Sequence, residues 1–316
     1  SQAELTTFLK QLIDAELIFG HGVSPKSSYT FKHALVRDAA YQSLLKAKRR
    51  ELHARVAEAL ESESPPAAPE LLAYHYTEAG LAGPAIANWQ TAGQQATRSA
   101  GNTEAIQHYQ KALELLELQP ENYECNATEL KILTNLGPLL MMMKGGSSTE
   151  VAEIYERAAE LAHHMESSQE LVPAIFGRWV FHVWGGRFDR ANDVAHELFE
   201  GAGATCDEAL LLQAHHAVWP TRMLRGDFEV SNEHVDKGLA IYDYEKHKHH
   251  AFLYLGHDPA VCGHSLKAGF TWALGFPNCA HGHAVQALRH ARRMGHAFTL
   301  AYGLFNVCLY HAARGD

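Results

Sequence analysis

Residues 89–96 read Trp-Gln-Thr-Ala-Gly-Gln-Gln-Ala, and Ala105, Tyr109 and Ala112 follow beyond a turn at Gly101. Small and bulky residues recur here at the spacing of one helix face. The small residues let two antiparallel helices approach closely, and the bulky ones fill the groove beside them. Glycine suits the turn because the residue that ends a helix often adopts a left-handed conformation. The stretch therefore predicts a helical hairpin.

This pattern resembles a tetratricopeptide repeat, and weaker copies follow it along the chain. They contain Val151, Tyr155 and Ala158; Trp179, Gly186, Ala191 and Leu198; Trp219, Gly226, Val235 and Leu239; and Gly275, Ala280, Ala284 and Leu288. Successive turn glycines from Gly146 to Gly315 are 40, 40, 49 and 40 residues apart, and a recurring period of about 20–50 residues is typical of a solenoid. The predicted fold class is all-α, a tetratricopeptide-like solenoid of helical hairpins over residues 70–316.

The first 61 residues differ from the rest because only they contain strand signals. The expected elements are, in order, a short helix, a β-hairpin and two helices: Thr6–Ala15, Leu17–Phe31, Leu35–Leu45 and Arg49–Glu61. This order predicts a small truncated winged-helix module with one β-hairpin over residues 1–61. Residues 62–69 contain three prolines in eight positions, which predicts a linker between two domains.

Several longer stretches resemble bacterial signalling ATPases of the AAA/STAND type, many of which also carry a class III adenylate or guanylate cyclase domain. These stretches are Tyr29–Leu45 (YTFKHALVRDAAYQSLL), Glu51–Leu60, Tyr74–Gly80, Gly256–Cys262, Ala273–Pro277 and Gly295–Ala301. The resemblance implies that residues 1–61 close an ATPase module and that residues 70–316 form its regulatory repeat region. Such a region would bind a partner or effector, or control the upstream ATPase or cyclase domains.

The triplet Arg-Gly-Asp occurs at residues 225–227 and again at 314–316, each time after an apolar helical stretch. A further helix-like run, Glu229–Tyr242, follows the first copy. We therefore expect the last repeat to be truncated. The resemblance to signalling ATPases implies in addition that ATPase and cyclase cores precede Ser1. The final helix, Leu304–Ala313, should expose an apolar face that offers a surface for self-association.

Composition excludes several function classes. The net charge of −9 over 316 residues gives no general footprint for nucleic acid or an anionic membrane. The sequence contains no signal-peptide pattern and no apolar run of the ~20 residues that span a bilayer. The five scattered cysteines favour a reduced, cytoplasmic protein. No cofactor motif is found, and a protein is the expected partner.

Histidine is the compositional outlier, with 22 copies, nine of them within residues 247–296 beside Cys262 and Cys279. Imidazole and thiolate are zinc ligands, and the candidate ligands are His247, His249, His250, His281 and His283. No H-E-x-x-H or C-x-x-C spacing supports them. We therefore predict structural or surface roles, with a zinc site in this segment as the alternative.

Repeat solenoids bind partners on a concave face, where aromatic side chains contribute much of the contact. The candidate partner-binding residues are Trp179, Phe181, Trp184, Trp219 and Tyr242. Packing inside the hairpins is the alternative role for these rings.

Two other functions are weighed on specific residues. His257 and Asp258 could act in acid–base catalysis, but no nucleophile elbow or spaced carboxylate pair accompanies them, so we predict no enzyme activity. The basic residues Lys46, Lys48, Arg49, Arg50 and Arg55 allow a DNA-binding regulator as an alternative. Residues 1–61 hold nine Lys and Arg against seven Asp and Glu, a small excess for a DNA-binding module.

Overall fold

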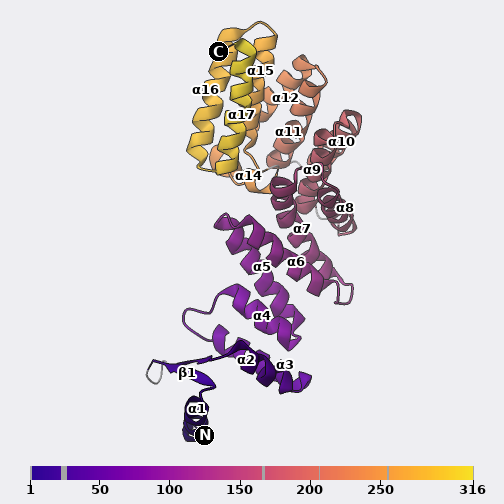
Figure 1. Ribbon diagram of the computed structural model, residues 1–316. Coiled ribbons are helices and arrows are strands. Elements are labelled where there is room, and N and C mark those ends of the chain that lie inside the picture. Colours follow the sequence, from indigo (N-terminus) through magenta and orange to yellow (C-terminus); the bar gives the residue numbers. More distant parts are fainter. Residues whose placement is uncertain (1, 23–26, 166–167, 206, 255, 316) are drawn as a thin grey trace. The chain divides into compact units, whose positions relative to one another are not determined.

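The computed structural model describes residues 2–22, 27–165, 168–205, 207–254 and 256–315, and it consists of helices and one two-stranded sheet (Figure 1). The chain divides into two compact units, one ending at Asn88 and the other beginning at Trp89. The predicted fold class, an all-α solenoid of helical hairpins preceded by a small module with one β-hairpin, is confirmed.

The first unit follows the expected order of elements. Its helices and strands are α1 (Gln2–Asp14), β1 (Ile18–His21), β2 (Ser28–Phe31), α2 (Ala34–Ser43), α3 (Lys46–Glu61) and α4 (Pro69–Ala79). The strands pair antiparallel, with Ile18 opposite Phe31 and His21 opposite Ser28. Helix α4 packs along α3. The division between compact units therefore lies C-terminal to the proline-rich segment that sequence predicts as the linker.

The second unit is a series of helical hairpins. Helix α5 (Ala82–Arg98) crosses the division between the units. The helices that follow it are α6 (Asn102–Leu116), α7 (Tyr123–Lys144), α8 (Thr149–His164), α9 (Ser168–Trp184), α10 (Phe188–Thr205), α11 (Glu208–Leu224), α12 (Phe228–Ile241), α13 (Tyr244–His247), α14 (His250–Leu253), α15 (Pro259–Ala273), α16 (Pro277–Met294) and α17 (Ala297–Arg314). From α6 to α12 each helix packs against the next one in sequence, and so do α15, α16 and α17. The first helices of successive hairpins, α7, α9, α11, α15 and α17, also contact one another in that order. Figure 1 shows the hairpins following one another in chain order.

The unequal repeat spacing has a structural cause. The interval between Gly226 and Gly275 is 49 residues rather than 40. The short helices α13 and α14 are inserted there, between the α11–α12 hairpin and α15. Aromatic contacts join this histidine-rich segment to the helices that follow, since Tyr244 lies against His290 of α16 and Phe252 lies against His296 at the start of α17.

Most turn glycines adopt the expected left-handed backbone. Gly186, Gly226 and Gly275 have φ values of 69°, 83° and 89°, a region that L side chains enter only at a cost. The turn after Trp89–Ala96 is different, because Gly101 has φ −80° and Ala100, at φ 60°, takes the left-handed position. The expectation for this one turn was therefore wrong by one residue.

Glycines also let neighbouring helices pack so closely that a single aromatic ring fills the space between them. The fully buried Tyr155 of α8 lies between Gly137 of α7 and Gly177 of α9. A Cβ atom added at Gly137 would lie 2.4 Å from the ring, and one added at Gly177 would lie 2.2 Å from it. The same arrangement pairs Gly93 with Tyr109, since a Cβ there would lie 2.7 Å from that ring. These pairs explain the small–large pattern of the sequence.

The final helix exposes apolar side chains, as the sequence leads us to expect. Leu304, Phe305 and Leu309 of α17 are 40%, 62% and 53% exposed. Self-association through this face stays a prediction. Within the described residues, no helix combines the length and the apolar composition that crossing a bilayer requires.

The glycine–tyrosine contact can be tested with matched alanine substitutions. Gly177→Ala should lower the free energy of unfolding by about 1–3 kcal/mol, because the added methyl group overlaps the Tyr155 ring in a closely packed interior. Gly282→Ala is the control, since nothing lies within 4 Å of a Cβ at that exposed position in α16. The control should gain roughly 0.5–1 kcal/mol from alanine's higher helix propensity. Equal effects of the two changes in urea unfolding would contradict this packing.

Candidate functional site

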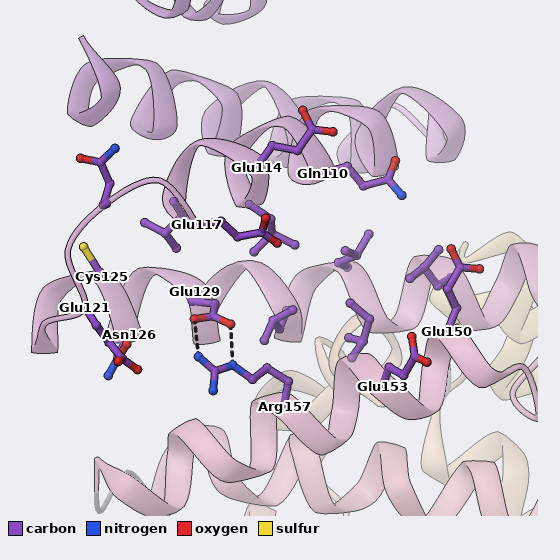
Figure 2. A pocket seen from close by; sticks show the side chains of 17 residues that line it. Gln110, Glu114, Glu117, Glu121, Cys125, Asn126, Glu129, Glu150, Glu153 and Arg157 are labelled. Carbon is purple, nitrogen blue, oxygen red and sulfur yellow. Dashed lines mark hydrogen bonds and ion pairs between the residues drawn. The ribbon is translucent and has the colours of Figure 1, made fainter. Parts of the chain in front are cut away.

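A groove of about 840 Å³ opens between α6, α7 and α8, and its lining is strongly acidic (Figure 2). Six glutamates surround it, from α6, from the connection to α7, from α7 itself and from α8: Glu114, Glu117, Glu121, Glu129, Glu150 and Glu153. These residues are spread over forty positions of the sequence, and only the packing of three helices brings them together.

The base of the groove is apolar and continuous with the core. Leu133, Leu136 and Leu140 of α7 line it from below and are almost fully buried. Leu113 of α6 and Ile154 of α8 are half-buried at its sides and pack against the buried cluster around Leu133. The groove therefore joins an apolar base to an acidic rim.

Only part of the acidic charge is neutralised within the protein. Arg157 of α8 forms a bidentate pair with Glu129, with Nε–Oε1 and Nη2–Oε2 distances of 2.7 and 3.0 Å. This hydrogen bonding raises the pKa of the Arg157 guanidinium. Glu150 pairs with Lys144. Glu114, Glu117 and Glu153 form no ion pair within the described part of the chain. The groove thus presents uncompensated negative charge above an apolar floor.

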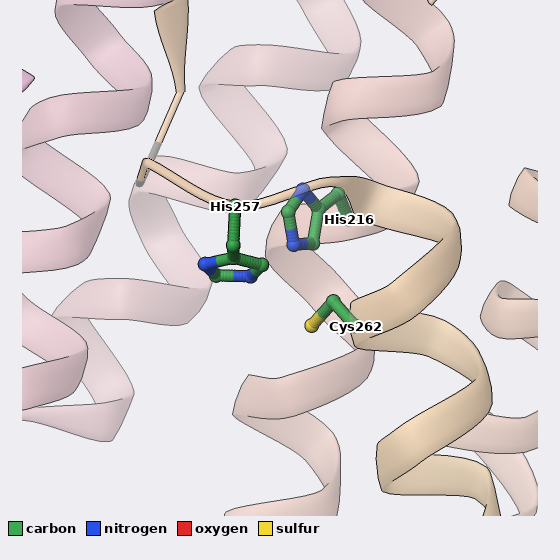
Figure 3. A group of neighbouring side chains, drawn as sticks. All are labelled: His216, His257 and Cys262. Atoms are coloured by element: carbon green, nitrogen blue, oxygen red, sulfur yellow. The ribbon is translucent and has the colours of Figure 1, made fainter. Parts of the chain in front are cut away.

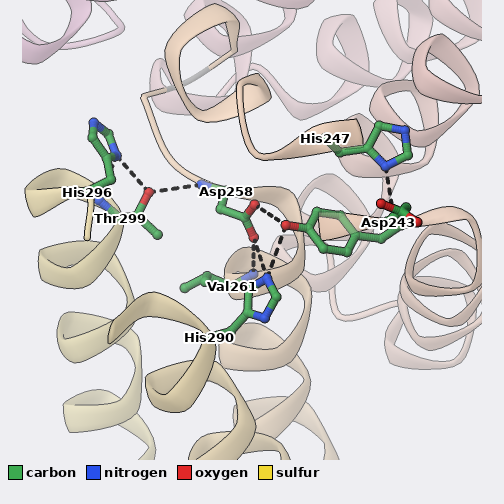
Figure 4. Close-up of polar contacts among 8 residues, drawn as sticks. Asp243, His247, Asp258, Val261, His290, His296 and Thr299 are labelled. Atoms are coloured by element: carbon green, nitrogen blue, oxygen red, sulfur yellow. Dashed lines mark hydrogen bonds and ion pairs between the residues drawn. The ribbon is translucent and has the colours of Figure 1, made fainter. Parts of the chain in front are cut away.

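A different polar site lies within the last hairpins, around the buried Asp258 (Figure 4). Its Oδ1 accepts the Val261 backbone N–H at 3.0 Å and so caps the N-terminus of α15. Its Oδ2 accepts the Tyr242 hydroxyl of the α12 C-terminus at 2.7 Å. The Asp258 backbone N–H donates to Thr299 Oγ1 of α17 at 3.2 Å. One aspartate therefore ties three helices together.

The electrostatics of Asp258 favour a structural role. Burial raises the pKa of its carboxyl group above the ordinary value, and the hydrogen bond from Tyr242 works against that rise. Both oxygens are engaged by groups of the protein, and the residue is 0% exposed. This geometry does not favour acid–base catalysis by His257 and Asp258, the possibility that the sequence raises.

Removing this aspartate should cost more than removing an ordinary helix cap. Asp258→Ala should lower the free energy of unfolding by roughly 2–4 kcal/mol, since α15 loses its cap and Tyr242 loses a buried acceptor. Asp207→Ala is the matched control, because exposed Asp207 caps α11 through Ala209 N–H at 2.8 Å. That change should cost about 1 kcal/mol. A cost at Asp258 no larger than that at Asp207 in urea unfolding would argue against the three-helix tie.

The predicted metal candidates do not gather around one point. His247 Nδ1 accepts the Asp243 backbone N–H at 2.9 Å, and the His249 and His250 rings lie 4.7 Å apart. His283 instead pairs with His264, with Nδ1 atoms 3.1 Å apart, and His281 is exposed. None of the five belongs to the group of three potential ligands that the described residues contain.

The predicted partner-binding aromatics fall into two environments. Trp179 and Trp219 are 1% and 0% exposed, and their indole N–H groups donate to Thr221 Oγ1 and Cys262 Sγ. The Tyr242 hydroxyl donates a hydrogen bond to Asp258. The Arg187 guanidinium carbon lies over the Phe181 ring, 4.1 Å from the ring centroid. Trp184 is half-exposed and is the one of the five with a large open surface.

The basic cluster of the first unit lies mainly on α3. Lys46, Arg49 and Arg50 line a small groove with Tyr41 and Glu78, and Arg49 lies over the Tyr41 ring at 5.1 Å. Lys48 pairs with Glu51 at 2.8 Å. Much of the positive charge is thus turned toward groups of the same unit.

No family model matches the chain. The uncharacterised protein R02095 of Rhizobium meliloti is 28% identical over 287 residues, which cover 89% of this chain and 28% of that protein. The chain therefore spans less than a third of that relative's length.

Two solved structures share the architecture. The Rap protein complexed with Competence and Sporulation Factor aligns with a TM-score of 0.57 at 14% identity, over 89% of this chain and 82% of its own. The apo form of RapI aligns with a TM-score of 0.50 at 14% identity, over 99% and 82%. These likenesses show the fold. It is a tetratricopeptide-like solenoid of helical hairpins.

Sequence reasoning missed the acidic groove. Most of its glutamates are exposed, and a charged residue is the ordinary choice at an exposed position. The available signal was their density, since residues 114–160 contain nine glutamates and only three Lys or Arg residues.

Proposed function

We propose that this chain is a non-catalytic, cytoplasmic repeat region that binds a partner protein through the acidic groove between α6, α7 and α8. The observation that carries the proposal is the combination of unpaired glutamates and an apolar floor in one concavity. A segment that fits it would place leucine-like side chains on the floor and lysine or arginine side chains against the rim.

An amphipathic helix with one basic edge meets these requirements. Such helices lie in grooves with their apolar face inward, and anchors at helical spacing determine the fit. Charges on the rim mainly speed association and favour a partner of opposite charge, while the buried apolar contacts keep the partner bound. The Rap neighbour, a repeat protein of similar fold, was solved in complex with a separate factor, which supports binding as the role of this fold here.

The parent protein in this proposal is a bacterial signalling ATPase of the AAA/STAND type, a class that includes adenylate cyclase-linked members. Its support is the resemblance of residues 29–60 together with the helix, hairpin, helix, helix order of the first unit. The groove would then bind either a separate effector or a basic segment of the upstream domains. The proposal requires a P-loop encoded upstream of Ser1, and a reading frame without one would contradict this part.

Neutralising the rim tests the groove itself. Glu114, Glu117 and Glu153 changed together to Gln should weaken binding of a fluorescent Lys- and Leu-containing amphipathic peptide about tenfold. Three exposed ion pairs contribute roughly 0.2–1 kcal/mol each, and 1.4 kcal/mol corresponds to tenfold. Fluorescence anisotropy at several salt concentrations measures the affinity, and salt should weaken the wild-type interaction more than that of the variant.

The matched control removes the same charge elsewhere. Glu63, Glu208 and Glu229 lie outside the groove lining and are exposed, and their joint change to Gln should leave the peptide affinity within about twofold, as expected for distant surface charges. An equal loss in both triple variants would show only a general effect of net charge and would contradict the groove as the binding site.

A further inference from the structure

Three buried side chains that are distant in sequence converge within the second unit (Figure 3). His216 comes from α11, His257 from the segment that precedes α15, and Cys262 from α15. They are 0%, 2% and 1% exposed. Each offers one potential ligand atom, and these three atoms lie within 4.8 Å of one another. Within the described residues, no other three His, Cys, Asp or Glu side chains come together in this way.

Hydrogen bonds fix which nitrogen of His216 faces this cluster. The Gln213 amide Nε2 donates to His250 Nδ1 at 2.6 Å, so its Oε1 is left to accept the His216 Nδ1–H at 3.0 Å. The lone pair of His216 therefore resides on Nε2. That atom is buried and has no hydrogen-bond partner within the described structure. A buried acceptor left unsatisfied costs about 1–3 kcal/mol, and a bound cation would remove that cost.

The sulfur of Cys262 is surrounded by groups that can donate to it. The Trp219 indole N–H donates to Sγ at 3.4 Å, and the Tyr302 hydroxyl lies 3.2 Å from the same atom. The Tyr302 ring also stacks on His257, with centroids 3.8 Å apart and planes 6° apart. Donors around a sulfur ligand stabilise its thiolate form, and stacking holds an imidazole in one orientation.

We propose that His216 Nε2, the His257 imidazole and the Cys262 thiolate bind one d10 transition-metal ion, Zn²⁺ or Cu⁺. Binding replaces the thiol proton: the S–H bond breaks, the metal–sulfur bond forms, and the proton leaves to solvent. Imidazole and thiolate are the donors that these two ions prefer. The ion would link α11 to α15 and to the segment before it, and so fasten the last two hairpins to each other.

Charge and ligand number distinguish the two ions. Two neutral imidazoles and one thiolate leave a Cu⁺ site electrically neutral, which suits a fully buried position. Zn²⁺ leaves one positive charge and normally takes four ligands. The Tyr302 hydroxyl, beside the sulfur, is the described group from which a fourth ligand would come.

Metal retention by the full, untagged chain tests the site. The background is Cys279→Ser with Cys308→Ser, because both thiols are exposed. The chelator-treated protein is loaded anaerobically with Zn²⁺ or with Cu⁺ in separate samples and desalted, and metal is counted by mass spectrometry. We expect a single equivalent of at least one ion to remain. Co²⁺ loading should give a thiolate-to-metal charge-transfer band.

Single substitutions test which side chains hold the retained metal ion. Cys262→Ala and His216→Gln should each abolish retention, whereas the double control His281→Ala with His283→Ala should retain the ion. Retention by Cys262→Ala, loss in the control, or failure of the folded background protein to keep either ion would overturn the site. Should the ligand variants fail to fold, the spectra of the background protein loaded with Co²⁺ and with Cu⁺ decide, because the absence of a thiolate-to-metal charge-transfer band from both also overturns the site.

Discussion

The insertion of the Tyr155 ring between Gly137 and Gly177 is the contact on which the packing of α7, α8 and α9, and with it the acidic groove, depends. It fixes the spacing of α7, α8 and α9 to the thickness of one aromatic ring, since any side chain at either glycine would overlap that ring. The same helix that buries Tyr155 carries Glu150, Glu153 and Arg157 into the groove. Close packing on one face of α8 therefore sets where charge is presented on the other.

The polar sites of the second unit are built on two opposite principles. The acidic groove keeps its carboxylates in contact with water, so their charge costs little and is available to a partner. The network around Asp258 and the cluster of His216, His257 and Cys262 are closed from water. There, every unpaired polar atom is expensive, and burial raises the pKa of the Cys262 thiol to about 11. The first arrangement suits reversible recognition, and the second suits fastening helices together.

The sequence predicted the architecture because local signals encode it. Backbone geometry requires the turn glycines at residues 186, 226 and 275, and ring volume requires small–large pairs such as Gly93 and Tyr109. Both requirements arise within one hairpin, so a short stretch of sequence shows them. The 49-residue interval was visible in the sequence, but its cause, the insertion of α13 and α14, required the structure.

The sites were harder to predict because they depend on which helix faces pack. Residue type alone makes Trp179 and Trp219 partner-binding candidates, yet both rings are buried. His281 and His283 are close in sequence but do not join a cluster, whereas His216 and Cys262 meet across two hairpins. Metal-ligand spacing rules describe ligands within one loop or helix, so they find no signal for a cluster assembled by tertiary packing. The groove glutamates were missed for the same reason.

In our proposal, the groove between α6, α7 and α8 is the surface that binds the partner. Cys125 lines that groove and is partly accessible, whereas Cys279 on α16 is exposed outside the groove lining. A photo-crosslinker attached to Cys125 in a Cys206→Ser, Cys279→Ser, Cys308→Ser protein should join a bound basic amphipathic peptide. The same reagent at Cys279 in a Cys125→Ser, Cys206→Ser, Cys308→Ser protein should not. Mass spectrometry of the crosslinked products would contradict the account if the peptide were captured equally from both positions, or from Cys279 alone.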